Sequence, residues 1–119
     1  MITFSGKTPE LYQLLPHLPP EVPLVVMTSH VEPAACPLVT SHPNSILLSA
    51  PIYESETISF GFSAPTSSTT VALALGDSIA LSVAQAVHTL PGRGPADVFR
   101  THHPGGAIGI ANKVDSVTL

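Results

Sequence analysis

The apolar residues of the chain fall into short segments that alternate between strand and helix patterns. Residues 1–4, 23–28 and 45–49 have strand length, and the run PLVVMT at 23–28 lacks polar alternation, which is typical of a parallel strand covered on both faces. Residues 9–15 carry leucines at helical spacing behind a proline, and a second short helix is expected to begin at Pro33. This order of elements predicts a parallel α/β sheet.

A single long helix is predicted over residues 66–88. Its body, VALALGDSIALSVAQAV, is apolar on nearly all sides, which is the pattern of a buried helix. Residues 50–65 contain proline and glycine and predict a loop, whereas residues 96–100, after the break PGRGP, predict a short helix. From residue 110 onward the sequence has no periodic pattern, and a weakly structured tail is expected.

Composition limits the kind of protein that these elements can form. Hydrophobic residues make up 44% of the 119 residues and charged residues 10%, with a net charge of −4, so we expect a compact fold that does not bind nucleic acid. Cys36 is the single cysteine, which predicts a buried thiol in a reducing compartment. Polar residues interrupt every apolar run and no signal peptide is evident, so a cytoplasmic protein without a membrane segment is expected.

The loop after the first predicted strand combines the parts of a phosphate-binding site. Thr3, Ser5 and Thr8 supply hydroxyl groups, and Gly6 permits close approach of the backbone to a ligand. The loop leads directly into a helix, whose first N–H groups attract anions. The alternative is an ordinary strand-to-helix turn in which Thr8 caps the helix.

Two later loops add further polar groups. Five successive hydroxyl residues, 66–70, precede and open the long helix, more than a single cap requires. The segment THHPGGAIG at 101–109 places His103 beside Pro-Gly-Gly, where an imidazole that titrates near neutral pH could reach a ligand. The other histidines (His17, His30, His42 and His88) lack the spacing of metal ligands and are interpreted as surface or loop residues, so no metal and no organic cofactor are expected.

Three of these segments together resemble one protein family. APTSSTTVALALGDSIAL (64–81) and FRTHHPGGAIG (99–109) are similar to motifs in the sugar isomerase (SIS) domains of arabinose-5-phosphate isomerases. ITFSGKTPELYQLLPHL (2–18) resembles their SxSGxTxEL phosphate loop and the helix that follows, with Phe4 in place of the usual Asn or Gln. The resemblance implies a flavodoxin-like fold, a three-layer parallel sheet flanked by helices.

The resemblance also implies roles for individual residues. It assigns phosphate binding to the first loop and to the start of the long helix, and proton transfer to two carboxylates and a histidine. Glu56 lies in ESET (54–57), which resembles the family's EREA segment with a shift of one residue. The implied phosphate-binding residues are Thr3, Ser5, Gly6, Thr8, Ser67 and Ser68, and the implied catalytic residues are His103, Glu56 and Glu10.

A complete SIS domain begins with a helix and a strand that lead to a GxGKS-like loop, and this sequence supplies none of them. We therefore expect residues 1–109 to be the C-terminal part of the domain and residues 110–119 to be a tail. The implied activity is aldose–ketose isomerisation of the arabinose 5-phosphate/ribulose 5-phosphate type. The alternatives are a sugar-phosphate sensor without catalysis and an inactive fragment. The expected partners are a phosphorylated sugar and further copies of the chain, since SIS domains pair through helices.

Overall fold

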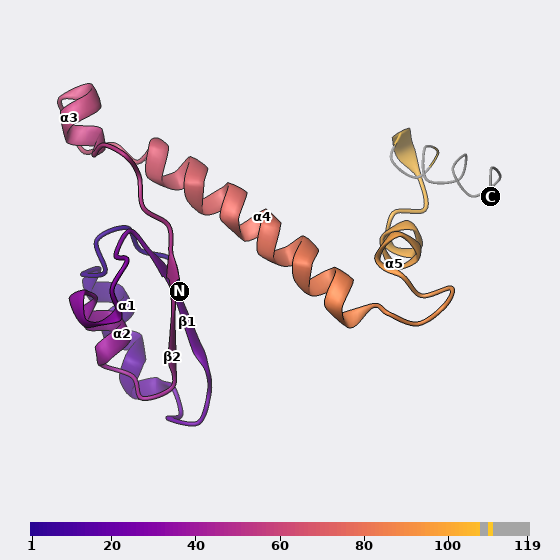
Figure 1. The fold of residues 1–119 in the computed structure, drawn as a ribbon, viewed down its shortest axis with the longest axis horizontal. Helices are drawn as coiled ribbons and strands as arrows, with labels where there is room; N and C mark the ends of the chain where they lie inside the picture. Colours follow the sequence, from indigo (N-terminus) through magenta and orange to yellow (C-terminus); the bar gives the residue numbers. More distant parts are fainter. Residues whose placement is uncertain (108–109, 111–119) are drawn as a thin grey trace. The chain divides into compact units, whose positions relative to one another are not determined.

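The computed structural model describes residues 1–107 and residue 110. The chain divides into two compact units, residues 1–76 and 77–119, and Figure 1 shows the elements of both. The long helix α4 (Ser67–Val87) begins in the first unit and ends in the second. The last part of the SIS-like motif, residues 108–109, and most of the expected tail, residues 111–119, lie outside the described residues.

The first unit holds most of the short elements. Its parallel sheet consists of two strands, and each helix that precedes β2 begins or continues at a proline, which is the residue type pre-organised for a first helical turn. In chain order the elements are α1 (Pro9–Leu14), the 3₁₀ turn η1 (Leu15–His17), β1 (Leu24–Thr28), the 3₁₀ turn η2 (Pro33–Ala35), α2 (Pro37–Thr40), β2 (Ser45–Ser49) and α3 (Glu56–Phe60).

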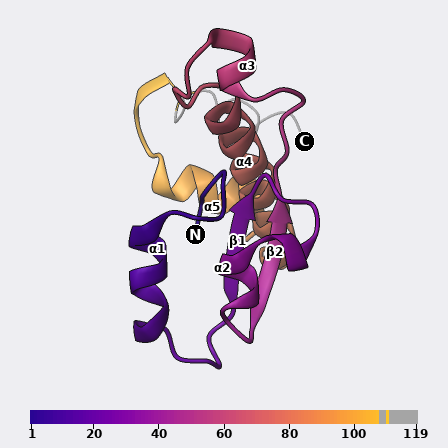
Figure 2. The same ribbon diagram turned by 90° about the vertical axis from the view of Figure 1, so that its left-hand side faces the viewer.

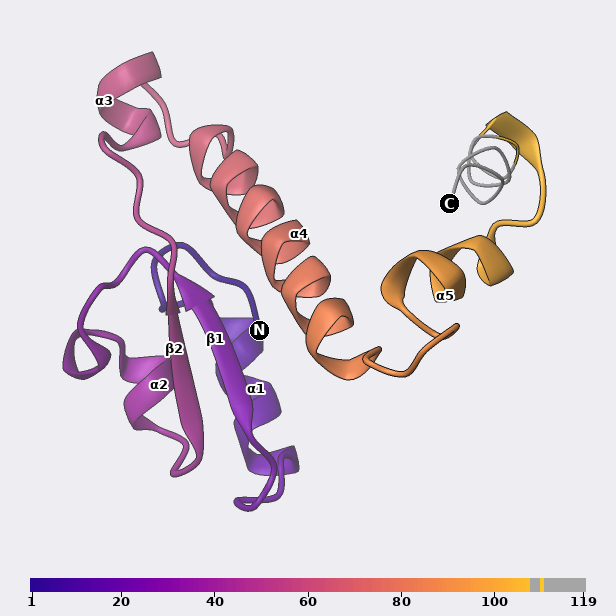
Figure 3. The same ribbon diagram turned by 45° about the vertical axis from the view of Figure 1, so that its right-hand side comes forward.

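The sheet confirms the predicted parallel arrangement. β1 and β2 pair in parallel with Leu24 opposite Ser45 and Thr28 opposite Ser49, and Figure 3 shows the two strands side by side. Residues 1–4 run along the other edge of β1 through one parallel bridge between Ile2 and Met27. The structure is thus mixed α/β with a two-stranded parallel sheet flanked by helices.

The core of the first unit lies on one face of this sheet. Leu24 and Val26 of β1 pack with Cys36, Leu38 and Val39, while leucines of α1 and η1 pack around them; Figure 2 shows α1 and α2 beside the strands. The opposite face is covered only in part: Val25 and Ile46 are 44% and 52% exposed, whereas Met27 is buried and shares a cavity with Ser68, Thr69 and Ala72 of α4. The expectation that the 23–28 strand is covered on both faces therefore holds at Met27 but not at Val25, which stays exposed.

Two further expectations need correction. The segment 50–65 is not only a loop, because it contains α3, which ends at Phe60 and is followed by Gly61 with φ +80°. The long helix is not buried, because none of its residues is buried, and Leu73 and Leu81 are 70% and 68% exposed. An all-round apolar helix needs surrounding chain to cover it, and a two-stranded sheet is too small to do so. By length and composition alone, α4 could also cross a membrane.

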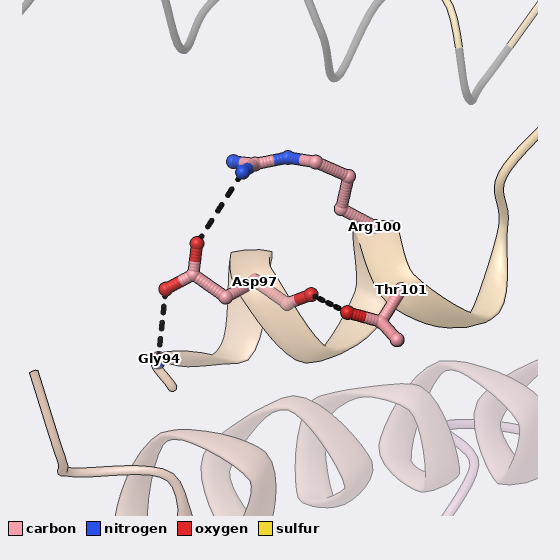
Figure 4. Close-up of polar contacts among 4 residues, drawn as sticks. All are labelled: Gly94, Asp97, Arg100 and Thr101. Atoms are coloured by element: carbon pink, nitrogen blue, oxygen red, sulfur yellow. Dashed lines mark hydrogen bonds and ion pairs between the residues drawn. The ribbon is translucent and has the colours of Figure 1, made fainter. Parts of the chain in front are cut away.

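The second unit contains the end of α4 and the helix α5 (Pro95–His102). Figure 4 shows how α5 begins. The carboxylate of Asp97 accepts a hydrogen bond of 3.1 Å from the amide of Gly94 and forms an ion pair of 3.4 Å with Arg100. The hydroxyl of Thr101 donates to the carbonyl of Asp97 at 2.8 Å. The bond from Gly94 satisfies the amide at the N-cap of α5. The helix Pro95–His102 confirms the one predicted over 96–100.

Candidate functional site

A cavity of about 310 Å³ in the first unit brings two of the sequence motifs together. It lies where the loop after residues 1–4 meets α3 and the first turn of α4. Seven hydroxyl side chains, one carboxylate and no Lys, Arg or His line it: Thr3, Ser5, Thr8, Ser55, Thr57, Ser63 and Ser68 with Glu56. The cavity is therefore suited to a ligand with many hydrogen-bonding groups, and it must hold an anion by dipoles instead of by a cationic side chain.

The hydroxyls of the first loop are held by one another. Thr3 is buried, and its hydroxyl lies 2.7 Å from that of Thr8. Thr8 occupies the N-cap position of α1 with an extended backbone, but its side chain caps no amide of that helix. The alternative interpretation of Thr8 as a helix cap is therefore wrong, because the bond to Thr3 turns its hydroxyl away from the helix. Ser5 accepts a bond of 3.2 Å from the amide of Lys7, which curls the loop.

Glu56 is the charged residue of the cavity. It is the first residue of α3 and is 6% exposed. One of its carboxylate oxygens accepts hydrogen bonds from the amides of Ser68, at 2.9 Å, and of Thr66, at 3.4 Å. These amides lie at the start of α4, where unpaired N–H groups and the helix dipole favour a negative charge.

The contacts of Glu56 determine its protonation state. Hydrogen bonds from the Ser68 side chain and amide, with weaker backbone contributions, lower the pKa of Glu56 from 4.5 to about 2, against a smaller opposing effect of burial. Glu56 is thus ionised at neutral pH. A carboxylate with so low a pKa is a weak base, since general-base catalysis is most efficient when the pKa lies near the working pH. In this arrangement Glu56 acts as a hydrogen-bond acceptor.

Other residues singled out from the sequence lie outside this cavity. Ser67 is the first residue of α4 but does not line the cavity, and Glu10 is exposed in the first turn of α1. Gly6 is a buried residue of the loop and does not line the cavity. It has φ +65°, and a Cβ atom there would lie 2.8 Å from the Sγ of Cys36.

His103 belongs to the second unit, at the C-terminal end of α5. Its Nδ1 lies 2.9 Å from the carbonyl oxygen of Phe99, and its ring stacks on the Phe99 ring with centroids 4.0 Å apart. The side chain is exposed and is held at the end of its own helix. These two contacts with Phe99 fix the orientation of the ring within α5.

Sequence reasoning missed part of the cavity wall. Ser55, Thr57 and Ser63 all line the cavity, and the hydroxyls of Thr57 and Ser63 lie 2.6 Å apart. The concentration of hydroxyl residues in 55–63 is a signal for them, although the proline and glycine pattern of 50–65 predicts only a loop. An adjoining, mostly apolar cavity of about 230 Å³ shares Thr3, Phe4, Pro65 and Ser68 with the first. Phe4 therefore contributes apolar surface to both cavities.

No metal site emerges from residues 1–107 and 110, which contain no cluster of three or more His, Cys, Asp or Glu side chains. His42 lies in the turn before β2, as expected for a loop residue, but it is buried, with Nε2 3.4 Å from the carbonyl oxygen of Pro19. Comparison with models of known protein families, with curated proteins and with solved structures finds no match to this chain. The chemistry of the cavity is thus the basis on which a function can be argued.

Proposed function

We propose that this chain is a cytoplasmic sugar-phosphate-binding domain of the SIS type. The observation that carries the proposal is the convergence of two distant motifs on one cavity. Thr3, Ser5 and Thr8 come from the first loop, Ser68 comes from the start of α4, and all four line it. They are four of the six phosphate-binding positions that the family resemblance implies, and the other two, Gly6 and Ser67, do not line the cavity.

The phosphate would be held by neutral donors in this cavity. Hydroxyl groups and loop amides can each donate to a phosphate oxygen, and hydrogen bonds to a charged group contribute about 1.5–3 kcal/mol each. The remaining hydroxyls, contributed by Ser55, Thr57 and Ser63, would face the hydroxyl groups of the sugar. A phosphorylated polyol matches this wall better than a purely apolar ligand does.

The proposed reaction is aldose–ketose isomerisation of the arabinose 5-phosphate/ribulose 5-phosphate type. It moves a proton between C1 and C2 through an enediol and requires a base, acid assistance at the oxygens and an anchored phosphate. We assign the base to Glu56, the acid to His103 and a supporting role to Glu10. Base action by Glu56 requires that ligand binding removes hydrogen bonds donated to it, because those bonds lower its pKa.

A second candidate is a sugar-phosphate sensor without catalysis. The low pKa of Glu56, about 2, and the apolar ring of Phe4 at the cavity wall favour it, since neither helps proton transfer. Our proposal also includes the three-layer parallel sheet of the SIS family and the association of this chain with further copies of itself. Both candidates require the same binding site, and they differ in turnover.

Calorimetry with arabinose 5-phosphate tests the shared part of the proposal. The double variant Ser5→Ala/Ser68→Ala should lower the affinity by about 100-fold or more, because two donors to the phosphate are lost. Thr40→Ala is the matched control, since the Thr40 hydroxyl is exposed and bonds the carbonyl of Pro37 in its own helix. Equal affinity in the wild type and the double variant would refute this site, and a coupled assay for ribulose 5-phosphate separates the enzyme from the sensor.

A further inference from the structure

Each carbonyl group of the loop from Phe4 to Gly6 accepts a hydrogen bond from a side chain outside the loop. The carbonyl oxygen of Phe4 accepts bonds from the hydroxyls of Thr28, at 3.0 Å, and Ser29, at 2.7 Å. The carbonyls of Ser5 and Gly6 are held by the side chains of His30 and Tyr12. His30 lies outside the segments that resemble the SIS family, and the resemblance implies no role for Tyr12. Nε2 of His30 lies 2.9 Å from the oxygen of Ser5, and the hydroxyl of Tyr12 donates to the oxygen of Gly6 at 3.0 Å.

We propose that His30 and Tyr12 are positioning residues of the phosphate site, holding the Ser5 and Gly6 carbonyls away from the ligand so that the loop amides face it. The proposal rests on the proposed function, because it specifies how that site is organised. His30 and Tyr12 do not line the cavity, so they act through the backbone of the loop. His30 must carry its proton on Nε2, because the carbonyl oxygen can only accept.

Because the peptide bond is planar, these hydrogen bonds to the carbonyl groups also fix the direction of the neighbouring amides. In a trans peptide the C=O and the following N–H point in opposite directions. The Ser5 carbonyl points to His30, so the Gly6 amide points away from it, and the Gly6 carbonyl points to Tyr12, so the Lys7 amide points away from that ring. The Lys7 amide does donate to the hydroxyl of Ser5, whose side chain lines the cavity.

The amides left by this arrangement are available to a ligand. Within residues 1–107, the N–H groups of Ser5 and Gly6 donate no hydrogen bond to the protein. Successive N–H groups of this kind form a concave anion site. A carbonyl oxygen that pointed into this site would repel the anion and weaken its binding. Gly6 has φ +65°, and glycine gives the loop the greatest freedom to turn its peptide units. The two ties restrict this freedom before the ligand arrives.

The hydroxyl of Tyr12 stays a donor under ordinary conditions. Burial, with a smaller contribution from the nearby Cys36 thiol, raises the pKa of Tyr12 above 10. The tie to the Gly6 carbonyl is therefore intact at neutral pH. The Tyr12 bond joins α1 to the loop that precedes this helix, whereas His30 joins the loop to the segment that follows β1.

Three variants test the proposal by calorimetry with arabinose 5-phosphate and with inorganic phosphate. His30→Ala and Tyr12→Phe should each weaken the binding of both probes by about 10-fold, the change expected when a preformed hydrogen-bond geometry is lost. His30→Gln should restore most of the affinity, because its amide nitrogen can donate to the same carbonyl. His17→Ala and Tyr53→Phe are matched controls at exposed positions and should bind like the wild type.

The outcomes separate this proposal from the proposed function. If the wild type binds neither probe, both fail. If the wild type binds and the His30 and Tyr12 variants bind equally well, the positioning role alone is overturned. A loss in His30→Ala that glutamine does not reverse also overturns the role of His30. Circular dichroism checks folding, and if His30→Ala unfolds, His30→Gln and Tyr12→Phe, which removes one oxygen atom, decide the result.

Discussion

Replacing Gly6 with alanine probes how closely the loop from Phe4 to Gly6 is packed against the core. Gly6 is buried with φ +65°, and an added Cβ atom would lie 2.8 Å from the Sγ of Cys36 and 3.1 Å from Cδ2 of His30. Cys36 is fully buried in the core cluster and has little room to move. The substitution therefore combines a backbone penalty with overpacking.

The expected magnitude follows from these two parts. A left-handed conformation costs an L-residue about 1–2 kcal/mol. Overpacking by one methyl group in a dense core costs about 1–3 kcal/mol. The smaller conformational freedom of alanine in the unfolded chain returns about 0.4–1 kcal/mol. Gly6→Ala should thus lower the free energy of unfolding by about 2–4 kcal/mol.

Urea denaturation followed by circular dichroism measures this change. Gly61→Ala is the matched control, because Gly61 has φ +80° but nothing within 4 Å of an added Cβ, so that only the backbone penalty of about 1 kcal/mol remains. Cys36→Ala makes room for the new methyl group. The double variant Gly6→Ala/Cys36→Ala should therefore be at least about 1 kcal/mol more stable than the two single changes predict together. Additive effects, or equal losses at Gly6 and Gly61, would show that the loop is not packed on Cys36.

Two further predictions concern acid stability and self-association. The pKa of Glu56 is about 2 in the folded chain, compared with an ordinary value of 4.5. The stabilisation that its carboxylate provides is therefore complete above pH 4.5 and is lost as the pH falls toward 2. Glu56→Gln should reduce the decrease in melting temperature over this range, and an acid profile equal to that of the wild type would contradict this prediction. Because Leu73 and Leu81 of α4 are exposed, the chain should form a dimer or larger assembly in light scattering, and Leu73→Gln/Leu81→Gln should shift it toward monomer. A monomeric wild type at high concentration would refute the second prediction.

The sequence predicts those elements whose signals are local. The apolar runs at 23–28 and 45–49 match β1 (Leu24–Thr28) and β2 (Ser45–Ser49) closely. Prolines mark the first turns of α1 and α5, because proline fixes φ near the helical value and lacks the N–H that a first turn leaves unpaired. Cys36 is buried as expected. Each of these depends on residues that are near neighbours in the chain.

Features that depend on tertiary contacts could not be predicted in this way. Thr8 has the residue type of a helix cap, but its hydroxyl bonds Thr3. The sequence predicts only that His30 is a surface or loop histidine, whereas its bond to the Ser5 carbonyl spans 25 positions of the sequence. The contact of Glu56 with the start of α4 requires that α3 turn back on the helix that follows it. Spacing along the chain carries none of this information.

The bond between Glu56 and Ser68 links binding to catalysis in the proposed site. With a pKa of about 2 against 4.5, Glu56 binds a proton about 300-fold more weakly than an ordinary glutamate. A phosphate at the start of α4 would compete for the same Ser68 donors, and its negative charge would raise the pKa of Glu56 further. If the phosphate displaces Ser68 from Glu56, the carboxylate becomes a stronger base as the substrate arrives, as an isomerase requires. If the phosphate leaves the Glu56–Ser68 bonds intact, Glu56 stays a weak base and the domain binds its ligand without turning it over.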